Sequence, residues 1–337
     1  FQQNEPEWCQ VFQYGQRTDE LMIEVEQLTK RYAGHTALRA LSFSVKKGQI
    51  VGFLGPNGAG KSTTMRIMST FMPPTSGRIQ IAGYDVARKP MEVRKRIGYM
   101  PENNPLHLDM RVEEYLRFRA GLKGVSADRL RTRLGEVLDL CDLSNVKRKI
   151  IGQMSKGYRQ RVGVADAILH QPEVIILDEP TIGLDPHQVR LFRKLICSLA
   201  TEHTVLLSTH ILSEVELTCD RILILHDGKL LADDSKETIH RRLGSLTHVV
   251  AEIAAPWEGL SQSLEAMPSI ADFKMEDLKH GFLKCHLTAR DEIDIRPLLF
   301  EEIKHRGWTL RELTRQQPAL EDLFVHLTHV RPNQKDV

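Results

Sequence analysis

The stretch at residues 55–63, GPNGAGKST, constrains the fold of this chain more than any other part. It follows an apolar run at residues 49–54, which predicts a buried strand, and precedes residues 64–69, which suit a helix. Between a strand and a helix, the glycines let successive backbone N–H groups point at one anion, and the helix N-terminus adds partial positive charge. We therefore predict a phosphate cradle that binds a nucleoside triphosphate.

Two side chains of this loop have expected tasks of their own. Lys61 is placed to contact the β- and γ-phosphates, and Ser62 to offer its hydroxyl to Mg²⁺. A glycine-rich turn followed by a chance Lys-Ser is the simpler alternative, which the flanking strand and helix disfavour. The candidate phosphate-binding residues are Gly55, Pro56, Asn57, Gly58, Ala59, Gly60, Lys61, Ser62 and Thr63.

Composition and length bound the class of protein. The 337 residues suffice for one large domain and a smaller companion, and a net charge of +2 gives no reason to expect a nucleic-acid partner. The five cysteines are scattered and never spaced as C-x-x-C, which suits a reducing compartment and argues against a zinc site. No window approaches the roughly 20 apolar residues of a membrane span, so any membrane crossing needs another chain.

The order of the predicted elements indicates an α/β core. Residues 1–20 have no apolar core, so we expect a disordered extension and no secretory signal. Residues 21–54 alternate short apolar runs with turns, which predicts an antiparallel β-region. Tyr32 is expected in a loop there; an aromatic ring at that place can stack on a purine, but a half-buried turn tyrosine is the simpler interpretation. Helical periodicity at residues 112–120 and 130–138 predicts a helical subdomain at about residues 105–160.

Polar residues end two strands of the core. Asp178 and Glu179 close a run of apolar residues that suits a parallel strand, and ligands bind at that edge of an α/β sheet. One carboxylate can order the water shell of Mg²⁺ and the other can accept a proton from an attacking water. His210 follows the next strand and can donate to a γ-phosphate, although a capping or surface histidine fits its position alone better in a chain with 14 histidines.

Near residue 244 the pattern restarts. Residues 245–330 predict a β-α-β-β-α-β order and a last helix at 319–327, which is a small ferredoxin-like α+β domain. We find no chemical motif in it. The chain therefore divides into an extension at 1–20, a catalytic domain at 21–240 and this accessory domain.

The segment from Met154 to Pro186, MSKGYRQRVGVADAILHQPEVIILDEPTIGLDP, resembles the signature, Walker B and D-loop motifs of an ABC transporter ATPase subunit. The resemblance covers about residues 22–240, where five motifs occur in the family's order. It is strongest to subunits that pair with ABC-2-type permeases, including drug, polysaccharide and gliding-motility exporters. It implies the ABC-type P-loop NTPase fold, with a RecA-like core, an antiparallel β-subdomain and a helical subdomain.

The resemblance also implies roles for individual residues. Lys61, Glu179 and His210 match catalytic positions, with Glu179 as the general base and His210 as the switch histidine. Ser62, Asp178 and Glu102 match positions around Mg²⁺. The remaining ATP-binding positions are the adenine-stacking Tyr32, the signature's Ser155 and Gly157, and the D-loop's Asp185; the signature of one subunit acts on ATP held by the other.

Three residues depart from the family's pattern. In the signature, Lys156 replaces a glycine and Tyr158 replaces a glutamine. Because Ser155 and Gly157 remain, we expect the signature to function. Glu102 stands where the family has the Q-loop glutamine, and its added negative charge bears on coupling to the membrane subunit rather than on ATP binding.

The function implied is that of an ATP-hydrolysing subunit whose homodimer, or dimer with a paired ATPase subunit, drives separate transmembrane permease subunits. It would be cytoplasmic and held at the inner face of the membrane by the permease, docked beside Glu102 through exposed residues such as Leu106, Tyr115 and Arg119. The alternative is a soluble ABC ATPase that acts on a macromolecular complex. A single cassette with a short helical insertion favours transport.

Overall fold

The computed structural model describes residues 20–239, 248–278, 281–290 and 293–316. The chain forms two compact units, Phe1–Asp234 and Ser235–Val337, and each is described by itself. Apart from Glu20, the expected disordered extension lies outside the described residues, and so does the helix predicted at 319–327.

The first unit contains an antiparallel sheet. Its strands are β1 (Leu21–Tyr32), β2 (His35–Lys46), β4 (Ser76–Ile81) and β5 (Tyr84–Asp85), in the order β2-β1-β4-β5. The β-region predicted before the phosphate loop is therefore present. Tyr32, however, is the last residue of β1 rather than a loop residue, because it still pairs with His35 across the β1–β2 hairpin.

A second, six-stranded sheet carries the phosphate loop. Its order is β10-β9-β3-β8-β7-β6, and the strands are β3 (Ile50–Leu54), β6 (Ile97–Met100), β7 (Val174–Asp178), β8 (Thr204–Thr209), β9 (Arg221–His226) and β10 (Lys229–Ser235). The strands β3, β7 and β8 are buried at every residue, as expected of parallel strands covered on both faces. The strand β8 lies between β3 and β7, although both precede it in sequence.

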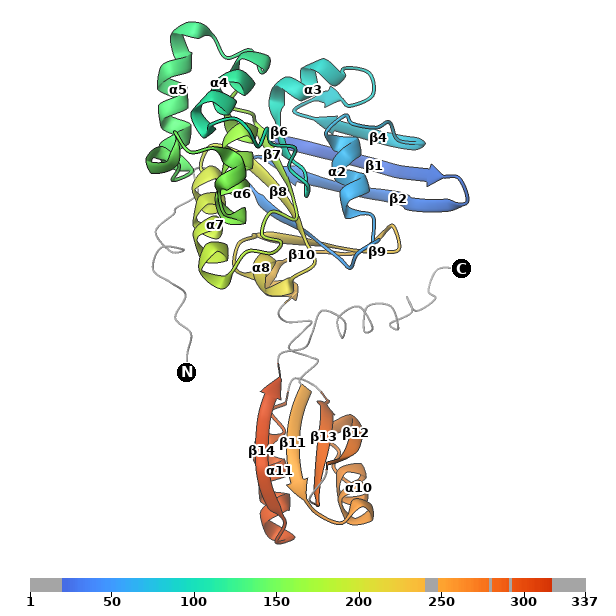
Figure 1. Cartoon of the computed structure of the whole chain (residues 1–337). Coiled ribbons are helices and arrows are strands. Elements are labelled where there is room, and N and C mark those ends of the chain that lie inside the picture. Colours follow the sequence, from blue (N-terminus) through green and yellow to red (C-terminus); the bar gives the residue numbers. More distant parts are fainter. Residues whose placement is uncertain (1–19, 240–247, 279–280, 291–292, 317–337) are drawn as a thin grey trace, which may run out of the picture. The chain divides into compact units, whose positions relative to one another are not determined.

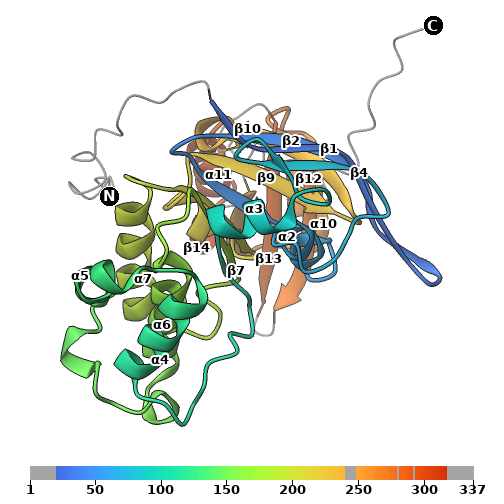
Figure 2. The same ribbon diagram turned by 90° about the horizontal axis from the view of Figure 1, so that it is seen from above.

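Helices surround the six-stranded sheet, and some of them also pack together as a separate group. The helices are α2 (Lys61–Met68), α3 (Pro90–Arg96), α4 (Val112–Leu122), α5 (Ala127–Leu140), α6 (Lys156–Ile168), α7 (Pro186–Leu199) and α8 (Leu212–Glu216), with 3₁₀ turns at Ser144–Val146 and Ile151–Gln153. In Figures 1 and 2, α4, α5 and α6 lie together on the side of the unit away from β1 and β2. Sequence periodicity does not predict α6, because its second half is buried on every side and shows no polar face.

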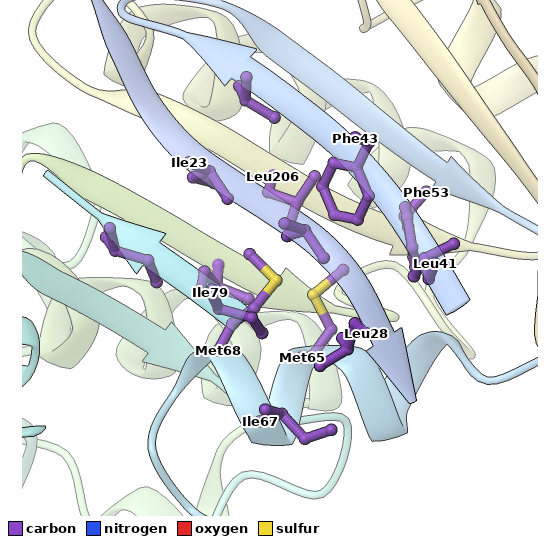
Figure 3. Packing of buried hydrophobic residues seen from close by; sticks show 14 of the residues in the cluster. Ile23, Leu28, Leu41, Phe43, Phe53, Met65, Ile67, Met68, Ile79 and Leu206 are labelled. Atoms are coloured by element: carbon purple, nitrogen blue, oxygen red, sulfur yellow. The ribbon is translucent and has the colours of Figure 1, made fainter. Parts of the chain in front are cut away.

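The helix that follows the phosphate loop is fixed between the two sheets. Met65, Ile67 and Met68 of α2 are wholly buried and belong to one core cluster with residues of both sheets. Figure 3 shows Met65 beside Leu28 and Met68 beside Ile79, with Phe53 and Leu206 of the parallel sheet in the same cluster. This packing holds the N-terminus of α2, and with it the loop, at the edge of the parallel sheet.

The described part of the second unit contains a four-stranded antiparallel sheet and the helices that pack on it. Its elements are β11 (His248–Ala254), α10 (Trp257–Glu265), β12 (Ile270–Leu278), β13 (Phe282–Ala289), α11 (Arg296–His305) and β14 (Thr309–Gln316). The strand order is β12-β13-β11-β14, and the order of elements is the β-α-β-β-α-β of a ferredoxin-like unit. Leu260, Leu264, Leu299 and Ile303 of the helices complete its core.

Candidate functional site

The backbone of the phosphate loop requires glycine. Gly60, the N-cap of α2, has φ +106°, which is a conformation that other residues rarely adopt. A Cβ at this position would lie 2.6 Å from Leu38 Cδ2 and 2.9 Å from Ala37 O. The β2 strand therefore closes one side of the loop, and a side chain at residue 60 would displace it.

Lys61 lies across the loop that it ends. Its Nζ donates to Gly55 O at 2.6 Å and to Pro56 O at 3.3 Å, and lies 3.3 Å from Glu179 Oε1. The side chains of Lys61 and Glu179 are only 5% and 7% exposed, so little water screens this ion pair. The ammonium is thus held by two carbonyl oxygens of the loop and by the Glu179 carboxylate.

Asp178 is the last residue of β7 and receives two hydroxyl groups. Ser62 Oγ donates to its Oδ1 at 3.2 Å and Ser208 Oγ donates to the same oxygen at 2.6 Å. Burial raises the pKa of Asp178, and the negative charge of Glu179 raises it further, whereas the two hydroxyl donors and Lys61 act in the opposite direction. The surroundings of Asp178 therefore favour its protonated form.

Glu179 follows in an uncommon backbone conformation. Its φ is +48°, in the left-handed region, which costs a non-glycine residue about 1–2 kcal/mol. Its N–H donates to Ser208, to Oγ at 3.0 Å and to the carbonyl oxygen at 3.2 Å. His210 Nδ1 lies 3.0 Å from Glu179 Oε2, so one carboxylate contacts Lys61 and His210 through its two oxygens.

A cleft of about 480 Å³ is lined by most of the predicted phosphate-loop residues; Gly55 and Ala59 are buried and do not line it. Tyr32 stands at one side of it, 45% exposed, with its hydroxyl 3.2 Å from Met72 Sδ. Glu102 is exposed and lines the cleft as well. The lining consists of Tyr32, His35, Ala37, Pro56, Asn57, Gly58, Gly60, Lys61, Ser62, Thr63, Glu102, Glu179 and Ile182.

Ser155, Gly157 and Asp185 do not line this cleft. Ser155 and Asp185 are exposed on a second surface, which we call the signature surface, and Gly157 is buried beside it. Ser155 is the exposed N-cap of α6, and Asp185 is the exposed N-cap of α7, where it accepts a hydrogen bond from Gln188 N at 2.9 Å. Gly157 packs against that same residue, since a Cβ there would lie 2.6 Å from Gln188 Oε1.

The sequence did not predict two polar residues at the site, His35 and Ser208. His35 lines the cleft, and Ser208 contacts both carboxylate residues. A histidine in a hairpin and a serine near a strand end are ordinary features, so neither carried a signal. Both owe their position to pairing between strands: His35 to Tyr32, and Ser208 to Asp178.

The prediction that Leu106, Tyr115 and Arg119 are exposed docking residues is partly wrong. Tyr115 is 2% exposed and packs inside the helical group, so it cannot face a partner. The guanidinium of Arg119 is bound to Asp166 through two hydrogen bonds, at 3.0 and 2.9 Å. Sequence periodicity assigned Tyr115 to α4 but not its rotation. The large apolar side chains that reach the surface in this region include Leu108, Phe118 and Leu122, which are 50%, 47% and 65% exposed.

The donors at the loop are suited to a hard cation. Ser62 and Asp178 offer oxygen atoms, and Glu102 lines the same cleft. Within the described residues, no three His, Cys, Asp or Glu side chains gather as a metal cage. The oxygen donors of Ser62 and Asp178 fit Mg²⁺, which is usually held by one or two protein oxygens together with substrate phosphates and water.

In the part of the chain that the structure describes, no helix is long and apolar enough to cross a membrane.

Comparison with known proteins agrees with this geometry. The family model described as "ABC transporter" matches residues 38–182, and one described as "AAA domain, putative AbiEii toxin, Type IV TA system" matches residues 150–216. The chain is 32% identical over 308 residues to the linearmycin resistance ATP-binding protein of Bacillus subtilis (strain 168), covering 91% of this chain and 98% of that protein. It is 40% identical over 308 residues to the bacitracin transport ATP-binding protein of Bacillus licheniformis, covering 91% and 97%.

Solved structures of similar fold support the same assignment. The structure of an ATP-binding subunit of an ABC transporter superposes with a TM-score of 0.60 at 34% identity, covering 66% of this chain and 93% of that one. A dimeric ATP-binding cassette in a post-hydrolysis state, bound to ADP and Pi, superposes with a TM-score of 0.59 at 26% identity, covering 64% and 99%. Since two relatives match at 32% and 40% identity along nearly their whole length, this chain belongs to the ATP-binding subunits of ABC transporters, which hydrolyse ATP on a P-loop NTPase fold.

Proposed function

We propose that two copies of this chain enclose two ATP molecules between the cleft of one and the signature surface of the other, and that the resulting cycle drives a separate membrane permease. The division of the site carries this proposal. The phosphate loop and Glu179 line one cleft, whereas Ser155 and Asp185 are exposed on another surface of the same chain. A second copy supplies the missing half, as the dimeric form of a related cassette supports.

The proposed substrate movement is export. One relative is named for linearmycin resistance and another for bacitracin transport. A third, from Streptomyces coeruleorubidus and 31% identical over 307 residues, is named for daunorubicin resistance. Resistance by transport requires movement out of the cell. We infer an antibiotic or a similar molecule as cargo, selected by the permease, and a site of action at the inner membrane face.

ATP binding rearranges the contacts of Lys61. Its ammonium now donates to Gly55 O and Pro56 O and faces Glu179. The phosphates of ATP offer stronger, charged acceptors at the same place, so we expect Lys61 to exchange the carbonyl oxygens for phosphate oxygens. Tyr32 stacks on the adenine at the open side of the cleft, and backbone N–H groups of the loop bind the phosphates.

Glu179 is the proposed general base. Its carboxylate accepts a proton from the attacking water, while His210, at 3.0 Å from Oε2, orients it. Ser62 and Asp178, with Glu102 nearby, would hold Mg²⁺ or its water shell, and the ion would neutralise charge on the phosphates. Ser155 and the close backbone at Gly157 serve the γ-phosphate of ATP bound to the partner copy.

The test is complementation between two inactive variants. Ser155→Arg blocks the signature surface and keeps the phosphate loop; Lys61→Ala weakens the loop and keeps the signature surface. Each alone should hydrolyse ATP at a small fraction of the wild-type rate. A mixture contains dimers with one complete composite site, so hydrolysis should reappear. A mixture that stays as inactive as its components would contradict the division of the site between copies.

A second variant tests the general base. Glu179→Gln keeps the loop but cannot accept a proton, so turnover should fall about 10²- to 10⁴-fold while a dimer accumulates with ATP and Mg²⁺. Size-exclusion chromatography and phosphate release measure the two effects. Transport is tested by cell fractionation with and without the permease gene: sedimentation with membranes in the absence of any permease would argue against docking through it.

A further inference from the structure

Ser208 lies inside the six-stranded sheet, near the end of its strand β8. It is the penultimate residue of β8 and is 0% exposed. In the parallel sheet it pairs with Phe53 of β3, the strand that leads into the phosphate loop, and with Asp178 of β7. It therefore lies between the phosphate loop's strand and the strand that carries the carboxylates.

One hydroxyl group links the two carboxylate residues. Ser208 Oγ donates to Asp178 Oδ1 at 2.6 Å and accepts from Glu179 N at 3.0 Å. A serine hydroxyl has one donor and two acceptor sites, so both bonds form together. The Ser208 carbonyl oxygen accepts from the same N–H at 3.2 Å. Glu179, whose φ is +48°, is thus held by both polar groups of Ser208.

Two hydroxyl groups hold the carboxylate of Asp178. Ser208 Oγ donates to its Oδ1 at 2.6 Å, and Ser62 Oγ donates to the same oxygen at the longer distance of 3.2 Å. Ser62 belongs to the helix that follows the phosphate loop, whereas Ser208 belongs to the sheet and is fully buried. Ser208 is therefore the donor that orients the Asp178 carboxylate from within the sheet.

We propose that Ser208 is a positioning residue for ATP hydrolysis, acting through Asp178 and Glu179 rather than on ATP. Its hydroxyl fixes the direction of the Asp178 carboxylate and the left-handed turn that points the Glu179 side chain toward Lys61 and His210. This role rests on the proposed functions of Asp178 and Glu179. It differs from a packing role, which the Ser208 side chain could fulfil without a hydroxyl.

The experiment compares three variants of the full-length protein. Ser208→Ala removes the hydroxyl, and Ser208→Cys keeps the volume with a weaker donor. The matched control is Thr204→Val, which removes the buried hydroxyl that accepts from Gly48 N at 3.0 Å at the opposite end of the same strand. Steady-state hydrolysis gives kcat, and calorimetry with EDTA gives the affinity for ATP without Mg²⁺.

Ser208→Ala should lower kcat about tenfold or more, since a buried hydrogen bond to a charged group is lost. Affinity for ATP in EDTA should stay within about twofold, because the loop is intact. The kcat of Ser208→Cys should fall between those of the wild type and Ser208→Ala, and this variant supplies the result if the alanine variant does not fold. Thr204→Val should leave kcat unchanged.

Three outcomes would overturn the inference. They are a wild-type kcat for Ser208→Ala, an affinity for ATP in EDTA that falls as much as kcat does, and an equal loss of kcat in Thr204→Val. Failure of the underlying roles is separately visible, because Glu179→Gln would then still turn over ATP.

Discussion

Asp166 connects α6, the helix that begins at the signature, to α4 of the same helical group. It lies in α6, 6% exposed, and its carboxylate binds Arg119 of α4 at 3.0 and 2.9 Å and Lys123 Nζ at 3.3 Å. Lys123 also donates to the Asp166 carbonyl oxygen at 2.6 Å. Replacing Asp166 by alanine would leave two cations without their carboxylate in a largely buried place.

The size of the effect follows from exposure. Removing one partner of a buried ion pair costs about 3–5 kcal/mol, because the remaining charge stays desolvated. The Arg119 side chain is 34% exposed and that of Lys123 is 17% exposed, so water recovers part of the loss. Burial already lowers the pKa of Lys123, and Asp166 opposes that shift. We expect Asp166→Ala to lower the free energy of unfolding by about 2–3 kcal/mol.

A double-mutant cycle in urea tests this reasoning. Arg119→Met removes one cation and keeps much of its apolar stem. The double variant Asp166→Ala with Arg119→Met should cost less than the sum of the single variants, since fewer charges are left alone. ATP affinity of the folded monomer should not change, because the cleft residues lie elsewhere. A loss below about 0.5 kcal/mol for Asp166→Ala, or strictly additive costs, would refute the role of this network.

Three further predictions concern the cleft and the helical group. Asp178→Asn should raise the Tm of nucleotide-free protein at pH 7 and abolish hydrolysis. Because the pKa of Asp178 is raised, the stability from this group is present below its ordinary pKa of 3.8 and is lost as pH rises through the raised value. A lower Tm for the variant would contradict this assignment. Burial, aided by Lys123, lowers the pKa of His170 from 6.5 to about 4, so the stability from this group is present above pH 6.5 and is lost as pH falls toward 4. His170→Gln should remove most of that loss, which is at most about 3 kcal/mol. Parallel curves of Tm against pH for the variant and the wild type would argue against this role. Lys61→Ala should weaken ATP binding about 10- to 100-fold in a calorimetric titration, because a charge-assisted contact is lost, and an unchanged affinity would mean that the loop binds phosphate without it.

The sequence by itself determined the parts of the site that are contiguous in the chain. The loop from Gly55 to Thr63 needs glycines at fixed positions between a strand and a helix, and the structure has Gly60 at φ +106° as that requirement demands. The apolar run before Asp178 likewise indicated a strand buried on both faces, with carboxylates at its end. Local conformation and short-range patterning encode such features, so one chain of letters suffices to read them.

Tertiary structure decided which distant residues meet. Tyr32 belongs to a strand because it pairs with His35, and Tyr115 is interior because α4 packs against α6 around Asp166. Ser208 reaches Asp178 only because β8 enters the sheet between two strands that precede it in the chain. Strand order and helix rotation are set by the burial of surfaces far apart in sequence, which the pattern within one segment does not contain.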